Sequence, residues 1–395
     1  MNIIMYRYGS ICEPDMIEAF KMAGLNVIEE KTEITNKRIS AAERVSLVEK
    51  HIKASSPVFV FSINFYPAIA DICAIYQVPY LCWTVDSPVP ELFSQSTLKP
   101  FNRIFCFDQA QFDTYSKYNP DCIFHLPLAS AVDRFDSVVS SINDKDIASY
   151  SCDISFVGSL YTEKDHLSDM SKLPDYSKGF VNGVSEAALK IYGYNLIPGA
   201  LNDQVVADIK NYMGQNYINI PNPLCGEASL DKYIVAHNYI GFHVAAIERT
   251  RTLNALAKYF DVDLYTRSDV SKLDGVNAKG GVQTLTEMPK IFNLSKINLN
   301  MTIRPIETGL PLRCFDIMGC GGFLMTNYQS ELTDMFEIGV DLEAYSSVEE
   351  LIDKCAYYLE HEEERAAIAY NGYMKVKNNY TYFHRMKEML NAVVG

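Results

Sequence analysis

The chain has 395 residues, 48% of them hydrophobic, which is long enough for two α/β domains. Its net charge of −14 argues against nucleic acid or an anionic membrane as the main partner, because both require a basic surface. The 10 cysteines form no C-x-x-C pair and no His/Cys cluster with metal-ligand spacing, which indicates reduced thiols in a cytoplasmic protein. No stretch reaches the roughly 18 apolar residues of a transmembrane segment.

The first half of the chain alternates short apolar runs with amphipathic stretches. This pattern predicts a parallel sheet covered by helices. The predicted strands are 2–8, 58–63, 79–85, 103–107 and 123–128. Ligands of such sheets bind beyond the carboxyl ends of the strands, so the polar residues there are candidates. No G-x-G-x-x-G follows the first strand, so the dinucleotide fingerprint of hydride-transfer enzymes is absent.

One of these strand ends carries the only tryptophan together with a carboxylate and a proline, in Trp83-Thr-Val-Asp-Ser-Pro. Asp86 is therefore a candidate general base that removes a proton from an attacking hydroxyl. The alternative is a turn-forming aspartate that bonds to the backbone before Pro88.

A polar stretch rich in Ser, Asn and Asp, residues 133–150, is the predicted linker between the domains. The first domain then covers residues 1–132 and the second covers 151–372. Residues 163–240 read as a helical insertion in the second domain, because they show helical patterns and turns without a clear strand. Residues 373–395 read as a C-terminal helix.

Small or polar residues also follow strands of the second domain. Gly158 and Ser159 end a strand that starts at Asp153, and the glycine would let backbone approach a phosphate or sugar. Tyr265 and Thr266 end the strand 262–266, where they could lie near a base or ribose. A further strand is predicted at 282–285. Arg249, near the start of a helix, could reach donor phosphates or be a solvated surface charge.

The most informative stretch is 297–322, which predicts a strand, a loop and a helix that starts at Pro311. The helix start at 308–312 is a possible anion site, and Arg304 and Arg313 place two guanidinium groups beside it. Asp316 lies three residues after Arg313, where its carboxylate could accept hydrogen bonds from ribose hydroxyls. The alternative is an ordinary surface Arg–Asp pair.

The segment Gly309-Leu-Pro-Leu-Arg313 followed by Asp316-Ile-Met-Gly-Cys-Gly-Gly resembles the donor site of GT-B glycosyltransferases with a group 1-like C-terminal domain. It is most similar to the bacterial branch of spore maturation glycosyltransferases, and the likeness extends to 287–300, 357–361 and 379–385. Retaining relatives carry two glutamates eight residues apart. Here Asp316 matches the second, whereas Thr308 stands at the first and Glu307 is one residue off.

The resemblance implies two Rossmann-like domains that face each other across a cleft. The first would hold the acceptor, the second would hold the nucleotide sugar, and the last helix would cross back to the first domain. Arg304 and Arg313 would stabilise the leaving diphosphate, with Asp86 as the base. The expected donor-binding residues are Gly158, Ser159, Arg249, Tyr265, Thr266, Asn300, Thr308, Gly309, Leu312 and Asp316.

The predicted activity is that of a hexosyltransferase, which moves a sugar from a nucleotide-diphosphate donor, expected to be a UDP-sugar, to a hydroxyl of a protein or glycan. No metal or other cofactor is expected, since no D-x-D element lies at a strand end; Asp261-Val-Asp263 lies at a strand start. Two alternatives remain open: a nucleotide-sugar epimerase of the same fold, and an inactive module that binds a glycan or a partner.

Overall fold

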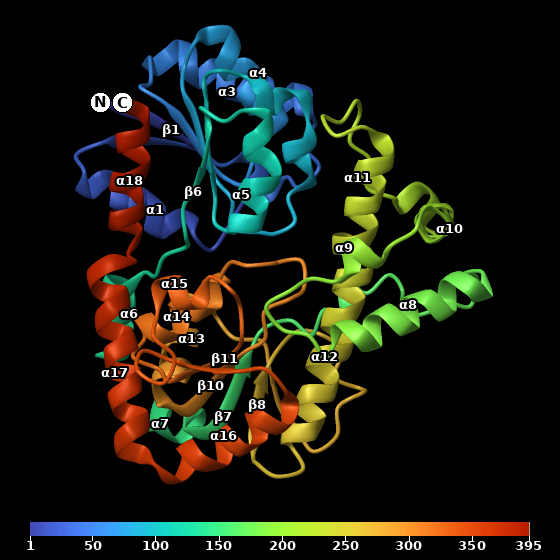
Figure 1. Ribbon diagram of the computed structural model, residues 1–395. Coiled ribbons are helices and arrows are strands. Elements are labelled where there is room, and N and C mark those ends of the chain that lie inside the picture. Colours follow the sequence, from blue (N-terminus) through green and yellow to red (C-terminus); the bar gives the residue numbers. More distant parts are fainter. Residues whose placement is uncertain (395) are drawn as a thin grey trace. The chain divides into compact units, whose positions relative to one another are not determined.

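The computed structural model describes residues 1–394, and the chain forms two compact units (Figure 1). Unit 1 contains Met1–Ala129, Asn219–Leu230 and the chain from Tyr380 onward. Unit 2 contains Ser130–Ile218 and Asp231–Asn379. Each unit is built on its own six-stranded sheet in which every strand pair is parallel. The predicted two-domain α/β organisation is therefore confirmed.

The sheet of unit 1 has the order β2-β1-β3-β4-β5-β6. Its strands are β1 (Asn2–Tyr6), β2 (Asn26–Glu30), β3 (Val60–Ile63), β4 (Tyr80–Trp83), β5 (Asn102–Cys106) and β6 (Ile123–His125). The five predicted strands are confirmed, whereas β2 was missed because this edge strand buries only Glu30. The chain reverses its direction across the sheet between β1 and β3, which is the position where such sheets form a crevice.

Helices cover both faces of this sheet and start at recognisable caps. Ser40 begins α3 with a capping box to Glu43, and Pro67 begins α4 at a position where its missing N–H costs nothing. The helices are α1 (Glu13–Met22), α2 (Thr32–Thr35), α3 (Ala41–Ser55), α4 (Pro67–Tyr76) and α5 (Gln109–Tyr115), with short 3-10 turns η1 (Pro90–Phe93), η2 (Gln95–Leu98) and η3 (Ser116–Tyr118).

The last helix of the chain packs in unit 1. The expected single helix 373–395 is instead broken: α17 (Glu362–Asn379) ends in unit 2 and α18 (Tyr382–Val394) packs against α1. The ring of Tyr382 meets Trp83 edge-on, with centroids 5.9 Å apart. Arg385 Nε donates to the carbonyl of Leu128 at 3.4 Å.

The sheet of unit 2 has the order β12-β11-β10-β7-β8-β9, which is the Rossmann arrangement. Its strands are β7 (Cys152–Val157), β8 (Val262–Tyr265), β9 (Asn277–Gly280), β10 (Ser295–Asn300), β11 (Leu324–Asn327) and β12 (Glu343–Tyr345). The strand expected at 282–285 is wrong, since β9 ends at Gly280. All four residues of β9 are exposed, so this edge strand carries no apolar run to detect.

The core of unit 2 lies between its central strands and the helices behind them. Ile154, Leu264 and Leu299 from the sheet pack with Leu253 of α12 and Leu351 of α16, and all five are at most 1% exposed. The helices around this core are α6 (Val132–Val139), α7 (Asp144–Tyr150), α12 (Gly241–Leu256), α13 (Met288–Leu294), α14 (Leu312–Gly319), α15 (Leu332–Met335), α16 (Val348–Glu360) and α17.

The predicted linker 133–150 is corrected: it folds as α6 and α7 within unit 2. The polar residues that suggested a linker cap and cover these helices. Asn143 begins α7 with a capping box to Asp146, and α7 has no buried residue, while α6 buries only Val132 and Phe135.

The insertion at 163–240 is helical and contains α8 (Asp175–Ala188), α9 (Ile197–Ala200), α10 (Asp203–Met213), α11 (Glu227–Ile234) and the 3-10 turns η4 (Thr162–Lys164) and η5 (Gly214–Asn216). Its expected end at 240 falls inside one long helix, because the π-helical segment η6 (Val235–Ile240) joins α11 to α12 without a break (Figure 1). Within residues 1–394, none of the helices combines the length and apolarity that crossing a bilayer requires.

Candidate functional site

The reversal of strand order in unit 2 lies between β7 and β10, so the chain segments that follow these strands meet at one place. Arg249 of α12 holds them together. Its Nη1 donates to the carbonyl of Ser159 at 2.5 Å and its Nη2 donates to the carbonyl of Met301 at 2.6 Å. The guanidinium also lies over the ring of Tyr161, 4.6 Å from its centroid.

Burial lowers the pKa of Arg249. The expectation that Arg249 reaches donor phosphates is therefore corrected: its Nη groups brace the exits of β7 and β10, and its Nε is buried without a partner among the described residues.

Arg304 is also buried in the protein interior, where it forms an ion pair. Its Nη2 pairs with Glu248 Oε1 at 2.9 Å, the two side chains are 5% and 4% exposed, and the guanidinium lies over the ring of Tyr192 at 4.7 Å. A buried cation of this kind must keep its counter-ion, because an uncompensated charge in the interior is costly. The expectation that Arg304 contacts a phosphate directly is corrected to a structural ion pair.

Arg313 and Asp316 lie on α14, as predicted. Arg313 Nη1 is 3.3 Å from Asp316 Oδ2, and the side chains are 24% and 8% exposed. The guanidinium stacks over Phe292 at 5.2 Å. The Arg–Asp pair therefore forms, and Arg313 is more exposed than Arg304. Pro311 is the N-cap of α14 and not its first helical residue.

Thr308 and Gly309 form the end of the loop that precedes α14. Thr308 Oγ1 donates to Glu331 Oε1 at 2.6 Å, and the Glu331 N–H donates to the Thr308 carbonyl at 3.1 Å. Gln329 Nε2 approaches the Gly309 carbonyl at 3.5 Å. The loop is thus tied to the segment that leads into α15.

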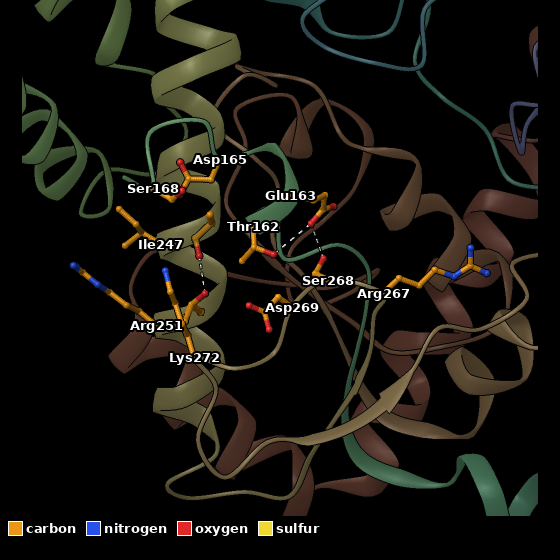
Figure 2. Close-up of a pocket in the computed structure, with 12 residues that line it drawn as sticks. Thr162, Glu163, Asp165, Ser168, Ile247, Arg251, Arg267, Ser268, Asp269 and Lys272 are labelled. Carbon is orange, nitrogen blue, oxygen red and sulfur yellow. Dashed lines mark hydrogen bonds between the residues drawn. The ribbon is translucent and has the colours of Figure 1, made fainter. Parts of the chain in front are cut away.

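The exits of β7 and β8 are joined through Glu163. Its carboxylate accepts hydrogen bonds from Ser159 Oγ at 2.6 Å and from Ser268 Oγ at 2.9 Å. Glu163 and Ser268 line a cavity of about 470 Å³ next to α12. In Figure 2, Arg251 lies on the helix side and Arg267 extends away from the other labelled side chains. Ser159, a predicted donor-binding residue, therefore already has a carboxylate as its partner.

The remaining predicted donor residues mostly hold the strand ends in place. Asn300 is 4% exposed and donates to the hydroxyls of Thr302 and Thr326, each at 2.9 Å. The Gly158 N–H donates to the Tyr265 carbonyl at 3.1 Å, and Thr266 Oγ1 accepts from the Ser268 N–H at 3.1 Å. Leu312 is half-buried at the start of α14.

Unit 1 has its own pocket, of about 420 Å³, at the carboxyl ends of β1, β3 and β4. Asp86 is exposed there, and its Oδ2 accepts a hydrogen bond from Asn64 Nδ2 at 2.7 Å. Asn64 Nδ2 also approaches the Tyr8 hydroxyl at 3.2 Å, and burial together with the charge of Asp86 raises the pKa of Tyr8. The other lining residues are Arg44, Phe65, Tyr66, Pro67, Pro88, Val89 and Glu91.

Asparagine suits position 64 because the backbone there is in the left-handed region. Asn64 has φ of 58°, which asparagine tolerates better than most residues. Its Oδ1 accepts from the Val85 N–H at 3.0 Å, so the amide group links the exits of β3 and β4 and aims its Nδ2 at Asp86. Polar residues that follow two neighbouring strands therefore meet at this end of the sheet.

Sequence reasoning missed the partners that fix these side chains, namely Glu163, His237, Glu248 and Glu331. Glu248 and Arg304 are 56 residues apart, and His237 and Glu307 are 70 residues apart. A single sequence carries no signal for such pairs, because local spacing reports only neighbours on one element.

Residues 249–391 match a family model described as glycosyl transferase-like. The whole chain is similar in fold to a glycosyltransferase from Rickettsia africae, with a TM-score of 0.54, 11% identity, and coverage of 99% of this chain and 97% of that chain. It is similar to HepE from Anabaena in complex with UDP and glucose, with a TM-score of 0.55, 11% identity, and coverage of 100% and 99%.

A sucrose-phosphate synthase from Thermosynechococcus elongatus has a TM-score of 0.51 at 9% identity, with coverage of 100% of this chain and 99% of that chain. No curated protein matches the sequence at a significant level. Identities this low bear on the fold alone, and they agree with the GT-B arrangement of two Rossmann-like units.

Proposed function

We propose that this glycosyltransferase of GT-B fold moves a sugar from a nucleotide-diphosphate donor to an acceptor hydroxyl without a metal ion. The glycosyl transferase-like match carries the proposal, because residues 249–391 include the loop after β10 and the whole of α14. The similarity in fold to HepE, which was solved with UDP and glucose, supports a UDP-sugar as the donor.

The donor side of the proposal uses α14 and its approach. Arg313 is 24% exposed, whereas Arg304 is 5% exposed, so Arg313 is the arginine that can turn toward a diphosphate. The first N–H groups of α14 add partial positive charge at the same place. A hydrogen bond to a charged group contributes about 1.5–3 kcal/mol and a surface helix end about 0.3–1 kcal/mol, so Arg313 should stabilise the diphosphate more than the helix end does.

Asp316 keeps its proposed role at the ribose. It lies one turn after Arg313, is 8% exposed and pairs with Arg313. When Arg313 binds a diphosphate, its pair with Asp316 weakens, and the Asp316 carboxylate also accepts hydrogen bonds from ribose hydroxyls. The contact between Arg313 and Asp316 is thereby partly replaced by a contact of Arg313 with the diphosphate and a contact of Asp316 with the ribose.

The acceptor side of the proposal uses the pocket of unit 1. Asp86 accepts the proton of the acceptor hydroxyl. At the same time the hydroxyl oxygen forms a bond to the anomeric carbon of the sugar, and the bond from that carbon to the diphosphate oxygen breaks. Negative charge then develops on the departing diphosphate, and Arg313 stabilises it more strongly in the transition state than in the ground state. Aromatic rings of Tyr8 and Tyr66 beside Asn64 and Asp86 suit a glycan or a protein side chain as the acceptor.

The test is incubation of the purified protein with a panel of nucleotide sugars, with and without glycan and protein acceptors. Free nucleotide and the identity of the sugar are both measured. Acceptor-dependent release of nucleotide supports transfer. Conversion of the sugar without an acceptor would identify an epimerase, and the absence of nucleotide binding would identify a glycan- or partner-binding module.

A further inference from the structure

The pocket of unit 1 contains a second carboxyl group, that of Glu91, in addition to that of Asp86. Desolvation raises the pKa of Glu91 and the charge of Asp86 raises it further, so the two carboxyl groups lie close enough to interact. Within the described part of the chain, no other residue forms a hydrogen bond or an ion pair with the Glu91 side chain. The side chain is therefore available to a ligand in the pocket.

Glu91 lies in the turn η1, which is fixed by hydrogen bonds to its neighbours. The hydroxyl of Tyr115 donates to the Val89 carbonyl at 3.1 Å, just before the turn. Thr97 Oγ1 donates to the Leu92 carbonyl at 2.9 Å, within the turn. The backbone is thus held on both sides of Glu91, and a ligand does not have to order it on binding.

The insertion adds a third support to this turn. Its residues 219–230 belong to unit 1, whereas the rest of the insertion belongs to unit 2. The Leu224 N–H donates to the Phe93 carbonyl at 2.8 Å, and Gln95 Nε2 donates to the Asn222 carbonyl at 3.1 Å. Both contacts lie at or just after the end of η1, so the insertion helps to hold one wall of the pocket.

Aromatic rings form the opposite kind of surface in the same pocket. The rings of Tyr8 and Tyr66 have centroids 6.2 Å apart and are tilted by 56°. Arg44 lies over the Tyr66 ring at 4.8 Å, and its Nη2 pairs with Glu33 at 3.0 Å. The arginine that lines the pocket therefore already has a carboxylate as its partner, and the pocket combines aromatic faces with two carboxyl groups.

We propose that the acceptor is a sugar and that Glu91 is an acceptor-binding residue, which bonds to a second hydroxyl group beside the one that reacts at Asp86. This inference rests on the proposed function and narrows its acceptor. A sugar ring has neighbouring hydroxyl groups that can donate to Asp86 and Glu91 at once, and its C–H face can pack on an aromatic ring. A serine or threonine side chain has only one hydroxyl group and cannot donate it to both.

The size of the pocket agrees with this acceptor. Its volume of about 420 Å³ is typical of sites that enclose a small molecule, and it exceeds what a single side-chain hydroxyl needs. Glu91→Ala should therefore raise the KM of a sugar acceptor about tenfold to a hundredfold, because it removes one hydrogen bond to a charged group. Glu91→Gln should raise the KM by less, and neither variant should change the affinity for UDP.

The experiment measures UDP release from a panel of UDP-sugars in the presence of two sets of acceptors. One set contains methyl glycosides of common hexoses, and the other contains peptides with serine or threonine. Release that depends on a methyl glycoside, with a higher KM in E91A and E91Q, supports the inference. Release that depends on peptides alone, no stimulation by any methyl glycoside, or a KM equal to that of the wild type in both variants would overturn it. If E91A does not fold, E91Q decides, since it keeps the shape of the side chain.

Monodeoxy analogues of the active methyl glycoside separate binding from a structural role. Removal of the hydroxyl group that Glu91 binds should raise the KM of the wild-type protein about tenfold or more, and it should have little further effect in E91A. If every analogue raises the KM of E91A by the same factor as that of the wild type, Glu91 does not contact the acceptor and the inference fails.

Glu18→Ala is the matched control. Glu18 is an exposed carboxylate on α1 of unit 1 and does not line the pocket. The KM of the sugar acceptor should equal that of the wild type in E18A, and an increase as large as that in E91A would overturn the assignment to the pocket. Protein that binds UDP but uses no sugar acceptor would overturn this inference alone, whereas protein that binds no UDP would overturn the proposed function as well.

Discussion

The two units contain the same kind of sheet but treat the carboxyl ends of their strands differently. In unit 1 these ends leave a pocket of about 420 Å³, in which the carboxylate of Asp86 is exposed and contacts the amide of Asn64. In unit 2 two arginines near the equivalent ends are paired with carboxylates, Arg304 with Glu248 and Arg313 with Asp316.

This difference follows from what each unit has to bind under the proposed function. A neutral hydroxyl needs an available base, and Asp86 is one. A diphosphate needs cations, but cations that stay unpaired in a half-buried site cost free energy before the ligand arrives. In unit 2, Arg304 and Arg313 are therefore held in ion pairs. We expect substitutions in the two units to differ in their effects: some should lower turnover, some should lower stability, and some should lower both.

The largest effect is expected for Asp86→Asn. The variant keeps the shape of the side chain and loses the ability to take a proton, so turnover should fall about 100-fold to 10,000-fold. Donor affinity, measured by titration with UDP, should stay unchanged. Asp71→Asn removes an exposed carboxylate on α4 that pairs with Lys99 and should keep full turnover. Near-normal turnover in Asp86→Asn would remove it from the mechanism.

Glu248→Ala should affect stability more than chemistry. It leaves the buried guanidinium of Arg304 without a counter-ion, which should lower the free energy of unfolding by about 3–5 kcal/mol. Glu186→Ala is its control: Glu186 pairs with Arg251 of the same helix as Glu248, but those side chains are 54% and 57% exposed. That variant should lose only about 0–1 kcal/mol. Equal losses in denaturant unfolding would contradict the burial argument.

Arg313→Ala should lower turnover about tenfold to a thousandfold, because it removes the proposed contact to the leaving diphosphate. Stability should fall less than in Glu248→Ala, since Arg313 is 24% exposed whereas Arg304 is 5% exposed. Arg251→Ala removes an exposed arginine on α12 and serves as the comparison. Turnover that falls equally in both variants would point to a general loss of positive charge and not to a specific contact.

The sequence predicts the fold of both units well because most strands are buried runs with polar ends. β1 and β10 carry apolar residues that a window of five or six residues detects, and α14 is visible from Pro311 and the glycines after Met318. The two missed strands share one cause. β2 and β9 are edge strands with few or no buried residues, so burial left no pattern in their sequences.

The candidate site is harder to predict, because a side chain's availability depends on partners that are distant in sequence. Arg249, Arg304 and Arg313 look alike in the sequence, yet Arg249 binds two carbonyl groups and Arg304 is enclosed with Glu248. Asp86 and Asn64 could be placed together because both follow neighbouring parallel strands. Topology therefore predicts which residues lie close together. It does not predict which of their side chains already have a hydrogen-bond or ion-pair partner within the protein.

The packing of α18 in unit 1 has a consequence for the order in which the chain folds. Arg385 bonds to a carbonyl group 257 residues earlier in the chain, and Tyr382 covers Trp83, the single tryptophan, which is fully buried. During synthesis the ribosome produces all of unit 2 before this helix emerges, so unit 1, whose strands are made first, is the last to receive all of its helices. We expect the fluorescence of Trp83 to change when α18 packs, because Tyr382 contacts its ring.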